Sequence, residues 1–448
     1  MNNEKKKSSS SISRRELLGA AAAVAAFTYV PKRILAASPN GKLNIAGIGV
    51  GGRGSSDING VSSENIVALC DVDWNRANGT FKKYPKAKKY KDFREMLDKE
   101  QKNIDAVVIG APDHIHAPAA IRAMQMGKHV YCEKPMAHTI YEARRMTEVA
   151  LETGVVTQMG NQGHAGEGLR LTYEFIQDGA IGEVDEVHVW TDRAGTADRA
   201  WWPQGVGRPE GTQPIPEHLS WDLWLGPAKW RPYNSAYVPF KWRGWFDFGC
   251  GALGDMAVHN ADPAFFCLGL DAPEAVEAES SPVNNETFPL WSIIHYYFPA
   301  KGKRPAVKMT WYDGGKKPAD PPELQGRSLK SNGIMFVGTK GKIVCGSHAG
   351  SPMLLPEELS RSYKKPEKML ERSPGHHKEW ILACKEGNPL KAKAGFWYSG
   401  PFTEALLVGN LAVRLGKRVE WDSKTMRSPN CPEADNYVTK FYRAGWEI

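Results

Sequence analysis

One lysine has both the residue type and the position for proton chemistry. Lys134 lies in Glu133-Lys134-Pro135, at the end of a short apolar run and 82 residues after a glycine-rich turn that ends at Gly52. If the run is a strand of a parallel sheet, its C-terminal end opens into the crevice where such sheets bind ligands. A lysine there can hold a substrate hydroxyl and relay its proton, particularly if burial lowers its pKa. The alternative is a surface lysine before a proline turn.

A carboxylate and an imidazole occur together further along the chain. Asp255 and His259 lie in the segment Gly251–His259 and are four residues apart, so on an α-helix they would share a face. A carboxylate beside an imidazole can orient the ring and raise its basicity, as a general base requires. A surface ion pair or a pair of metal ligands would have the same spacing.

The glycine-rich turn at Gly47–Gly52 follows the apolar run Leu43–Ile48. Its backbone amides could approach a pyrophosphate at the N-terminus of the next helix, although a turn without a ligand is the alternative. Asp71 comes nineteen residues after Gly52, where a carboxylate binds ribose hydroxyls and repels a 2′-phosphate. The spacing therefore favours NAD over NADP. The cofactor-binding residues predicted here are Gly47, Gly49, Gly51, Gly52, Arg53 and Asp71.

A polar loop, Ala111–His116, follows the third predicted strand and should pass near the nicotinamide-side ribose. Asp113 could instead only cap the helix that follows. His114 and His116 have the spacing of metal ligands, but no third ligand is near in the sequence, so we predict no metal site. The other cofactor contacts predicted at the sheet edge are Pro112, Asp113, His116, Glu133 and Lys134.

The first 37 residues have the composition of a targeting signal. They hold seven basic and two acidic residues, which is +5 of the total charge of +8 and leaves about +3 for the remainder. A charge of about +3 on the remainder gives little support for a nucleic-acid partner, so we predict none. Arg14 and Arg15 precede the apolar stretch Leu17–Val30, which resembles a twin-arginine (Tat) signal. We predict export by the Tat machinery to the periplasm or outside the cell; an uncleaved anchor or a cytosolic basic tail are alternatives.

The chain of 448 residues is long enough for two domains. Residues 41–160 alternate short β-branched runs with helical stretches, which predicts an α/β Rossmann domain with a doubly wound parallel sheet. Its predicted strands are Leu43–Ile48, Asn65–Cys70, Ile104–Ile109, His129–Cys132 and Val155–Met159. Its predicted helices include Phe93–Gln101, Ala117–Met126 and Tyr141–Glu152.

Residues 161–448 have longer strands without regular intervening helices. This pattern predicts an α+β domain with a large open, mainly antiparallel sheet and a helical C-terminal tail, at about 376–387 and 401–416. The predicted strands are Glu183–Thr191, Leu290–Phe298, Ala306–Trp311, Gly333–Val337 and Lys342–Cys345. The seven cysteines include no Cys-x-x-Cys, so we expect buried thiols and neither disulfides nor zinc.

Four of these motifs, Gly47–Gly52, Asp71, Glu133-Lys134-Pro135 and Gly251–His259, together resemble the Gfo/Idh/MocA oxidoreductase family. The resemblance covers about residues 41–446, with a tail similar to secreted bacterial members. It implies a Rossmann domain and an open-sheet domain that often forms dimers or tetramers. It also implies that His259 takes the hydroxyl proton, Asp255 orients His259, and Lys134 polarises the same oxygen while hydride passes to NAD.

The segment after the fifth strand departs from the family, which often has basic and aromatic residues there. This chain has Asn161-Gln162-Gly163-His164, so the resemblance does not imply a particular substrate; His164 is either a further acid–base group or a loop histidine. Eight of the fifteen tryptophans lie between Trp190 and Trp245; they could stack on sugar rings or only pack. The substrate-binding candidates are Asn161, Gln162, His164, Trp242 and Arg243.

The function predicted from these features is oxidation or reduction of a hydroxyl on a sugar, polyol or glycoside by tightly bound NAD. The alternative is a redox-neutral, NAD-dependent glycoside hydrolase that oxidises, eliminates, hydrates and reduces. A binding protein without catalysis is disfavoured because Lys134, Asp255 and His259 are all present.

Overall fold

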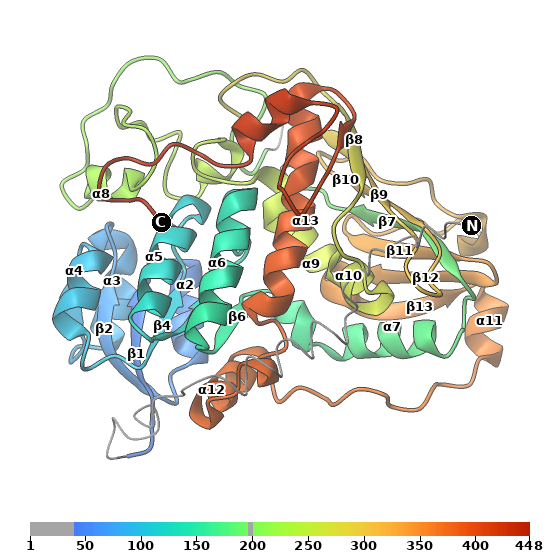
Figure 1. Ribbon diagram of the computed structural model, residues 1–448, viewed down its shortest axis with the longest axis horizontal. Coiled ribbons are helices and arrows are strands. Elements are labelled where there is room, and N and C mark those ends of the chain that lie inside the picture. Colours follow the sequence, from blue (N-terminus) through green and yellow to red (C-terminus); the bar gives the residue numbers. More distant parts are fainter. Residues whose placement is uncertain (1–39, 196–199) are drawn as a thin grey trace, which may run out of the picture.

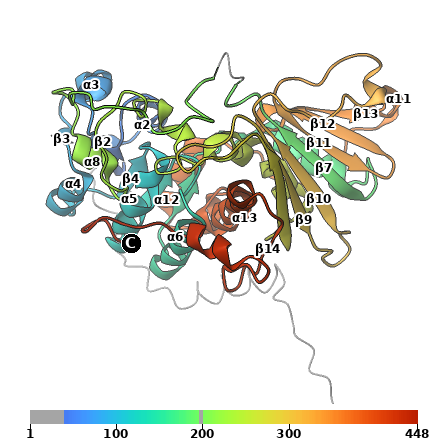
Figure 2. The same ribbon diagram turned by 90° about the horizontal axis from the view of Figure 1, so that it is seen from above.

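The computed structural model describes residues 40–195 and 200–448. The predicted signal at residues 1–37 therefore lies outside the described residues. Within the described ranges, no helix has the length and apolar character that a membrane span needs. The chain forms two sheets side by side, with a long helix, α13 (Phe396–Leu415), between them (Figures 1 and 2).

The first sheet is parallel and has the strand order β3-β2-β1-β4-β5-β6. The order reverses between β1 and β4, and the crevice at such a switch point binds ligands. Its strands are β1 (Asn44–Ile48), β2 (Asn65–Cys70), β3 (Lys88–Tyr90), β4 (Ala106–Ile109), β5 (His129–Cys132) and β6 (Thr157–Met159). The five predicted strands are confirmed to within two residues at each end. The edge strand β3 was not predicted because Lys88-Lys89-Tyr90 is polar and largely exposed.

Helices join these strands and cover both faces of the sheet (Figure 1). They are α2 (Arg53–Gly60), α3 (Trp74–Lys83), α4 (Phe93–Glu100), α5 (Asp113–Gln125) and α6 (Ile140–Thr153). Local signals set their ends: at the start of α6, Thr139 accepts the backbone N–H of Glu142, and the Glu142 carboxylate accepts that of Thr139. Gly154, in the left-handed conformation, ends the same helix.

The second sheet has eight strands in the order β13-β12-β11-β7-β10-β9-β8-β14. Only β7 and β10 pair in parallel; every other pair is antiparallel, so the predicted fold class is confirmed. Its strands are β7 (Val184–Trp190), β8 (Ala275–Ser280), β9 (Ser292–Phe298), β10 (Val307–Tyr312), β11 (Gly333–Gly338), β12 (Gly341–Gly346), β13 (Gly350–Leu355) and β14 (Val419–Glu420). Strands β8, β13 and β14 were not predicted.

The remaining helices are mostly short. They are α7 (Glu167–Gln177), α8 (Trp221–Leu225), α9 (Val258–Asn260), α10 (Asp262–Leu268), α11 (Glu357–Ser362) and α12 (His376–Glu386). Leu253–Ala257 (η3) is a π-helix; the 3-10 turns are η1 (Gln162–Ala165), η2 (Lys241–Gly244), η4 (Pro322–Leu324), η5 (Ser347–Ala349), η6 (Pro389–Lys391) and η7 (Pro432–Tyr437). The helix α12 returns to the first domain, where Trp380 and Ile381 share a core with Leu43 and Ile58.

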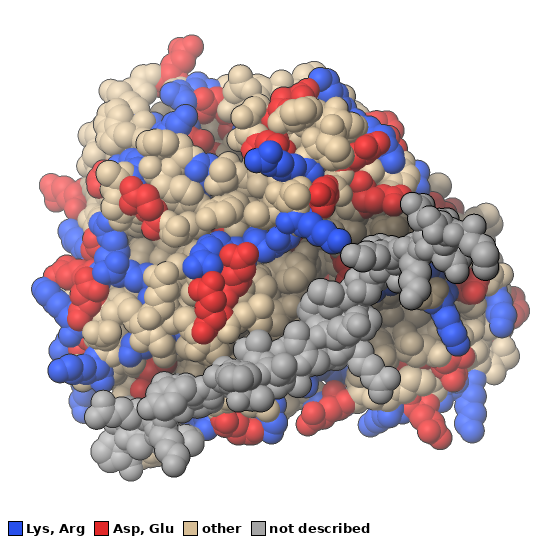
Figure 3. Space-filling model, in the orientation of Figure 1, with Lys and Arg blue, Asp and Glu red and all other residues tan. Residues whose placement is uncertain are grey.

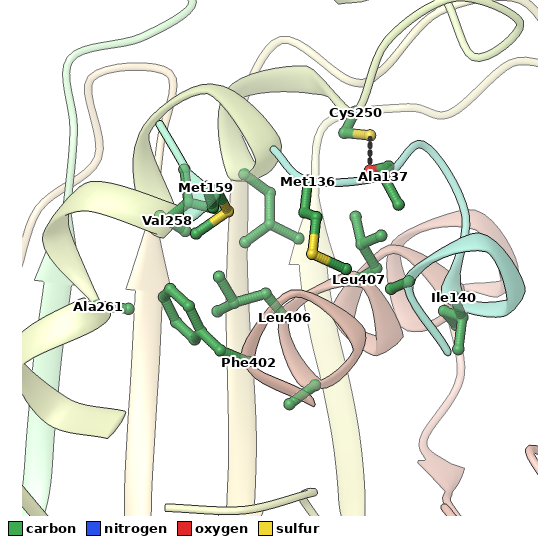
Figure 4. Close-up of a cluster of buried hydrophobic side chains, with 14 of the residues drawn as sticks. Met136, Ala137, Ile140, Met159, Cys250, Val258, Ala261, Phe402, Leu406 and Leu407 are labelled. Atoms are coloured by element: carbon green, nitrogen blue, oxygen red, sulfur yellow. Dashed lines mark hydrogen bonds between the residues drawn. The ribbon is translucent and has the colours of Figure 1, made fainter. Parts of the chain in front are cut away.

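One apolar cluster fixes the segment after Lys134 against the second domain. Met136, from that segment, lies among Phe402, Leu406 and Leu407 of α13, with Val258 of α9 nearby (Figure 4). The two domains are also joined by an ion pair between α6 and α13, in which the Arg144 guanidinium donates to both carboxylate oxygens of Glu404. These contacts hold the motifs of the two domains in one rigid arrangement.

The surface charges and the cysteines contribute little to holding the two domains together. On the face shown in Figure 3, basic and acidic side chains are interspersed among neutral ones. All seven cysteines lie within the described residues, and each is buried and free, as predicted. The Sγ of Cys250, for example, contacts the backbone oxygen of Ala137 at 3.7 Å (Figure 4).

Candidate active site

The glycine-rich turn forms a cradle that side chains would fill. Gly49 has φ +70°, and a Cβ on it would lie 2.6 Å from the backbone nitrogen of Ala111. Gly52 has φ +54°, and its Cβ would lie 2.3 Å from a guanidinium nitrogen of Arg76. Only glycine is free of both the steric overlap and the left-handed strain at these positions. The turn leads directly into α2, whose N-terminus can bind an anion.

This turn borders a cavity of about 340 Å³. Among the predicted cofactor residues, those that line the cavity are Gly49, Gly51, Arg53, Asp71 and Pro112. The Asp71 carboxylate accepts the backbone N–H groups of Gly51 and Asp73, both at 2.9 Å. Burial raises the pKa of Asp71 to about 6, although these two hydrogen bonds oppose the rise. Each oxygen can still accept a ribose hydroxyl, so the glycine cradle and this carboxylate fit a dinucleotide.

Arg53 lines the cavity, and Glu133, the neighbour of Lys134 in the chain, lies buried behind it. The Arg53 Nε lies 3.1 Å from Glu133 Oε1, and its Nη2 lies 2.9 Å from Asp57 Oδ1. Gln162 donates to the same Glu133 oxygen at 3.0 Å. Burial, with the Asp57 charge adding to it, raises the pKa of Glu133 to about 7. Glu133 is thus buried beneath Arg53 and Gln162, and holds these two side chains in place.

Lys134 meets Asp255 across the domain boundary. The Lys134 Nζ donates to the Asp255 backbone oxygen at 2.6 Å and to Asp255 Oδ1 at 2.8 Å. Arg243 donates from Nε to the same Oδ1 at 3.2 Å, and the Arg193 Nε lies 3.7 Å from Oδ2. Burial alone would raise the pKa of Asp255, but Lys134, Arg243 and Arg193 hold it well below its usual range. Asp255 is therefore a carboxylate that fixes three cations.

The predicted pairing of Asp255 with His259 is not formed within the described residues. The Nδ1 of His259 is buried without a hydrogen-bond partner there, and the ring lies against His348, with centroids 4.0 Å apart. The reason is local: η3 is a π-helix, which widens the turn so that residues four apart leave the common α-helical face. Burial first, then the charges of Lys134 and His348, lower the pKa of His259 well below its usual value. The ring is therefore neutral, and one ring nitrogen has a lone pair that can accept a proton, although the lowered pKa makes it a weaker base than a free histidine.

Two other predicted cofactor contacts have structural roles. Asp113 is buried, and its Oδ2 accepts the backbone N–H of Cys250 at 3.1 Å, so it does not cap its own helix. Burial raises the pKa of Asp113 to about 7. The two ring nitrogens of His116 lie 2.8 Å from the backbone oxygens of Pro135 and Ala111. Both residues therefore hold the loops around Lys134 and do not line the cavity.

The carboxylate–imidazole pair expected at residues 255 and 259 occurs instead between Asp262 and His164. The Nδ1 of His164 lies 2.9 Å from Asp262 Oδ2, Asn161 donates to that oxygen at 3.2 Å, and the Tyr398 hydroxyl donates to Oδ1 at 2.5 Å. Both His164 and Asp262 are almost fully buried. Asp262 was not predicted; its only signal was its position three residues after His259.

Trp242 and Arg243, predicted to contact substrate, line the nucleotide cavity. The Arg243 guanidinium lies 4.2 Å from the ring centroids of both Phe240 and Trp242. Of the eight tryptophans between residues 190 and 245, Trp201 and Trp230 are exposed and the other six are buried. Packing therefore explains six of the eight.

A cover over the cavity was not predicted. Its cavity-lining residues are Leu219, Leu223 and Trp224 from one segment and Trp446 near the end of the chain. Ser220 donates its backbone N–H to the Val72 oxygen at 2.9 Å. The Trp446 ring contacts the Arg94 guanidinium at 4.1 Å. These contacts fasten the cover to the Rossmann domain on two sides.

Together, a dinucleotide cradle and an interdomain lysine–aspartate pair define a two-domain, nucleotide-dependent oxidoreductase. Residues 43–161 match the family model described as an oxidoreductase family with an NAD-binding Rossmann fold, and residues 173–448 match the model for its C-terminal alpha/beta domain. The chain belongs to the Gfo/Idh/MocA oxidoreductase family, and its cofactor is NAD.

Similar proteins of this family include inositol 2-dehydrogenase from Salmonella typhimurium, 31% identical over 165 residues, which are 36% of this chain and 48% of that protein. Levoglucosan dehydrogenase from Pseudarthrobacter phenanthrenivorans is 28% identical over 178 residues, 40% of this chain and 36% of that one. Each match thus spans half or less of the relative. The fold is similar to that of the Bordetella pertussis WlbA dehydrogenase, solved with NADH and UDP-GlcNAcA (TM-score 0.57, 19% identity, covering 85% of this chain and 99% of that one).

Proposed function

We propose that this protein is an NAD-dependent oxidoreductase that acts on a hydroxyl of a sugar, polyol or glycoside and retains its cofactor tightly. The observation that carries the proposal is the Lys134–Asp255 pair, which joins the two domains and is linked to the nucleotide cavity through Arg243. The named relatives, inositol and levoglucosan dehydrogenases, support a polyhydroxylated substrate.

The side chains suggest how the hydroxyl is handled. An ammonium group has three N–H donors, and Lys134 gives two of them to Asp255, so the third remains for the substrate oxygen. His259, held neutral by burial, accepts the hydroxyl proton. Asp255 holds the Lys134 ammonium in place. NAD, held by the glycine cradle and Asp71, would supply the hydride acceptor for the carbon that carries this hydroxyl.

Tight retention of NAD is supported by the cover over the cavity. Its two fastenings, Ser220 to Val72 and Trp446 to Arg94, must open before a dinucleotide can leave. The ion pair between Arg443 and Asp222, at 2.6 Å, joins the C-terminal tail to the rest of the cover. A retained cofactor also suits an enzyme that works where free NAD is scarce.

The first experiment is to denature the purified protein and measure the NAD released. We expect close to one equivalent from the wild type and a clear loss after dialysis from Trp446→Ala and Arg443→Ala. Trp230→Ala is the control, because Trp230 is 66% exposed and lies outside the cavity. Wild-type protein that carries no NAD would refute tight retention.

Incubation with nitrophenyl glycosides and no added cofactor tests the reaction class. A keto glycoside together with reduced NAD in the protein supports the oxidoreductase. Release of nitrophenol without net reduction of NAD would support the redox-neutral glycoside hydrolase, which a retained cofactor also permits. Absence of both products across a panel of polyols and glycosides would refute the proposed function.

Two further proposals rest on the sequence. We propose export by the Tat machinery, supported by Arg14 and Arg15 ahead of the apolar stretch 17–30; replacing both arginines by lysine should keep a fused reporter in the cytoplasm. We also propose a homo-oligomer, a dimer or tetramer, from the family resemblance. Light scattering after gel filtration would measure the mass, and a monomer would refute it.

A further inference from the structure

The turn between β12 and β13 has an unusual backbone next to the candidate active site. His348 (φ +60°, ψ +35°), Ala349 (φ +58°) and Ser351 (φ +49°) all lie in the left-handed region although none is glycine. The left-handed region is strained for any residue that carries a Cβ. Strained residues of this kind persist where the surroundings enforce them, and they cluster at functional sites.

Close packing holds this turn against the segment that follows the first domain. A Cβ on Gly163 would lie 2.9 Å from the Cβ of His348, and one on Gly168 would lie 2.0 Å from the Ala349 oxygen. Larger residues at either glycine would push the turn away. The two glycines therefore let His348 approach the site.

A chain of hydrogen bonds fixes the proton on the His348 ring. The Nδ2 of Asn260 donates to the Trp190 oxygen at 3.0 Å, so its Oδ1 is the acceptor for the Ser347 hydroxyl at 2.9 Å and the His348 backbone N–H at 3.3 Å. The single hydroxyl hydrogen of Ser347 is thus used. The Ser347 oxygen must accept the contact at 2.7 Å from His348 Nδ1–H. In the neutral ring, Nε2 then keeps its lone pair.

This acceptor lies beside the imidazole that takes the substrate proton. The rings of His348 and His259 face each other at 30° with centroids 4.0 Å apart. The His348 Nε2 has no hydrogen-bond partner in the described parts of the chain, and the side chain is exposed. The imidazoles of His259 and His348 therefore lie next to each other, although they come from different segments of the second domain. Hydroxyls on adjacent carbons of a sugar ring have a separation that such a pair can serve.

We propose that His348 accepts a hydrogen bond from a second substrate hydroxyl, adjacent to the one oxidised, so that the enzyme selects vicinal diols. This inference rests on the proposed function and names its substrate class more narrowly. The roles proposed above for Lys134, Asp255 and His259 stay the same. Asn260 and Ser347 are positioning residues, because their hydrogen bonds fix the orientation of the His348 ring.

The test compares His348→Phe with the wild type on methyl glucoside and its 2-, 3- and 4-deoxy analogues, or on the equivalent set for whichever methyl glycoside is oxidised fastest. Phenylalanine can keep the ring contact with His259 but lacks Nε2. We expect the wild type to prefer the parent over one adjacent-deoxy analogue by about three- to tenfold in kcat/KM, the size of one lost hydrogen bond between neutral groups. His348→Phe should lose about the same factor on the parent and less than about 1.5-fold on that analogue. His348→Gln, which retains an acceptor, should recover part of the preference.

His295→Phe, on β9, is the matched control and should resemble the wild type. Equal losses on every substrate in His348→Phe would overturn the inference, as would a wild-type enzyme indifferent to the adjacent hydroxyls. The comparison of substrates with the wild type needs no variant, so it tests the inference even if His348→Phe fails to fold. A wild type that oxidises no polyol or glycoside would overturn the proposed function and this inference together.

Discussion

Removing either partner of the Lys134–Asp255 pair should have unequal effects on stability. Lys134→Met removes one of three cations around Asp255, whereas Asp255→Asn removes the only carboxylate that these cations share. The side chains of Lys134 and Asp255 are only 14% and 11% exposed, so solvent compensates little in either variant. Both variants should lose activity, but the loss of folding stability should differ between them.

The distances set the expected size. At an effective dielectric constant of about 20, contacts of 2.8, 3.2 and 3.7 Å correspond to gross attractions of about 6, 5 and 4.5 kcal/mol. Lys134→Met therefore leaves more than half of the attraction at Asp255, which stays ionised, and should cost about 1–2 kcal/mol. Asp255→Asn leaves Lys134 and Arg243 without an ion-pair partner among the described residues, while Arg193 still has Asp192 at 3.5 Å, and should cost about 3–5 kcal/mol, as for other broken buried pairs.

Thermal unfolding of both variants measures this difference. The NAD content of each sample must be equal, because bound ligand raises the midpoint. We expect Asp255→Asn to lower the midpoint at least about twice as far as Lys134→Met, and both to lose about 10²–10⁴ in kcat. A Lys134→Met variant as unstable as Asp255→Asn would refute the shared-carboxylate reasoning.

Further predictions concern the nucleotide cavity. Gly49→Ala should abolish NAD retention because its Cβ would meet the Ala111 backbone, whereas Gly79→Ala, at an exposed position in α3 with open space around it, should raise stability by about 0.5–1 kcal/mol; released NAD and the unfolding midpoint check both, and retained NAD in Gly49→Ala would contradict the first. NAD affinity, measured by calorimetry, should fall as the pH drops below about 6, because burial raises the pKa of Asp71 to about 6 and protonation removes the charged acceptor. Asp71→Asn should bind more weakly at pH 7 and lack this dependence; an unchanged pH profile in that variant would assign the titration elsewhere.

The first domain could be predicted closely because its strands are continuous apolar runs between glycine and helix signals. β3 had no such run, since Lys88-Lys89-Tyr90 carries two charges. In the second domain, β14 has only two residues, and β13 contains Pro352, so neither has a distinctive pattern. The topology of that sheet depends on pairings between segments far apart in the chain, which local periodicity does not specify.

The residues of the candidate site could be predicted better than the contacts between them. The family resemblance brought Lys134, Asp255 and His259 together, but an α-helical face was assumed for a segment that forms a π-helix, so the Asp255–His259 pairing failed. His348 carries no motif, because its place depends on a strained turn between two strands. The cover over the cavity combines residues more than 200 positions apart, such as Leu223 and Trp446.

The central claim is that Lys134 and His259 act on one substrate hydroxyl beside NAD. Its most direct test is the mass of the NAD extracted from denatured protein after incubation with a polyol or glycoside carrying deuterium on its ring carbons. We expect one deuterium in the nicotinamide ring for the wild type and little for Lys134→Met and His259→Phe at equal NAD content. Unlabelled NAD in the wild type, or wild-type labelling in both variants, would contradict it.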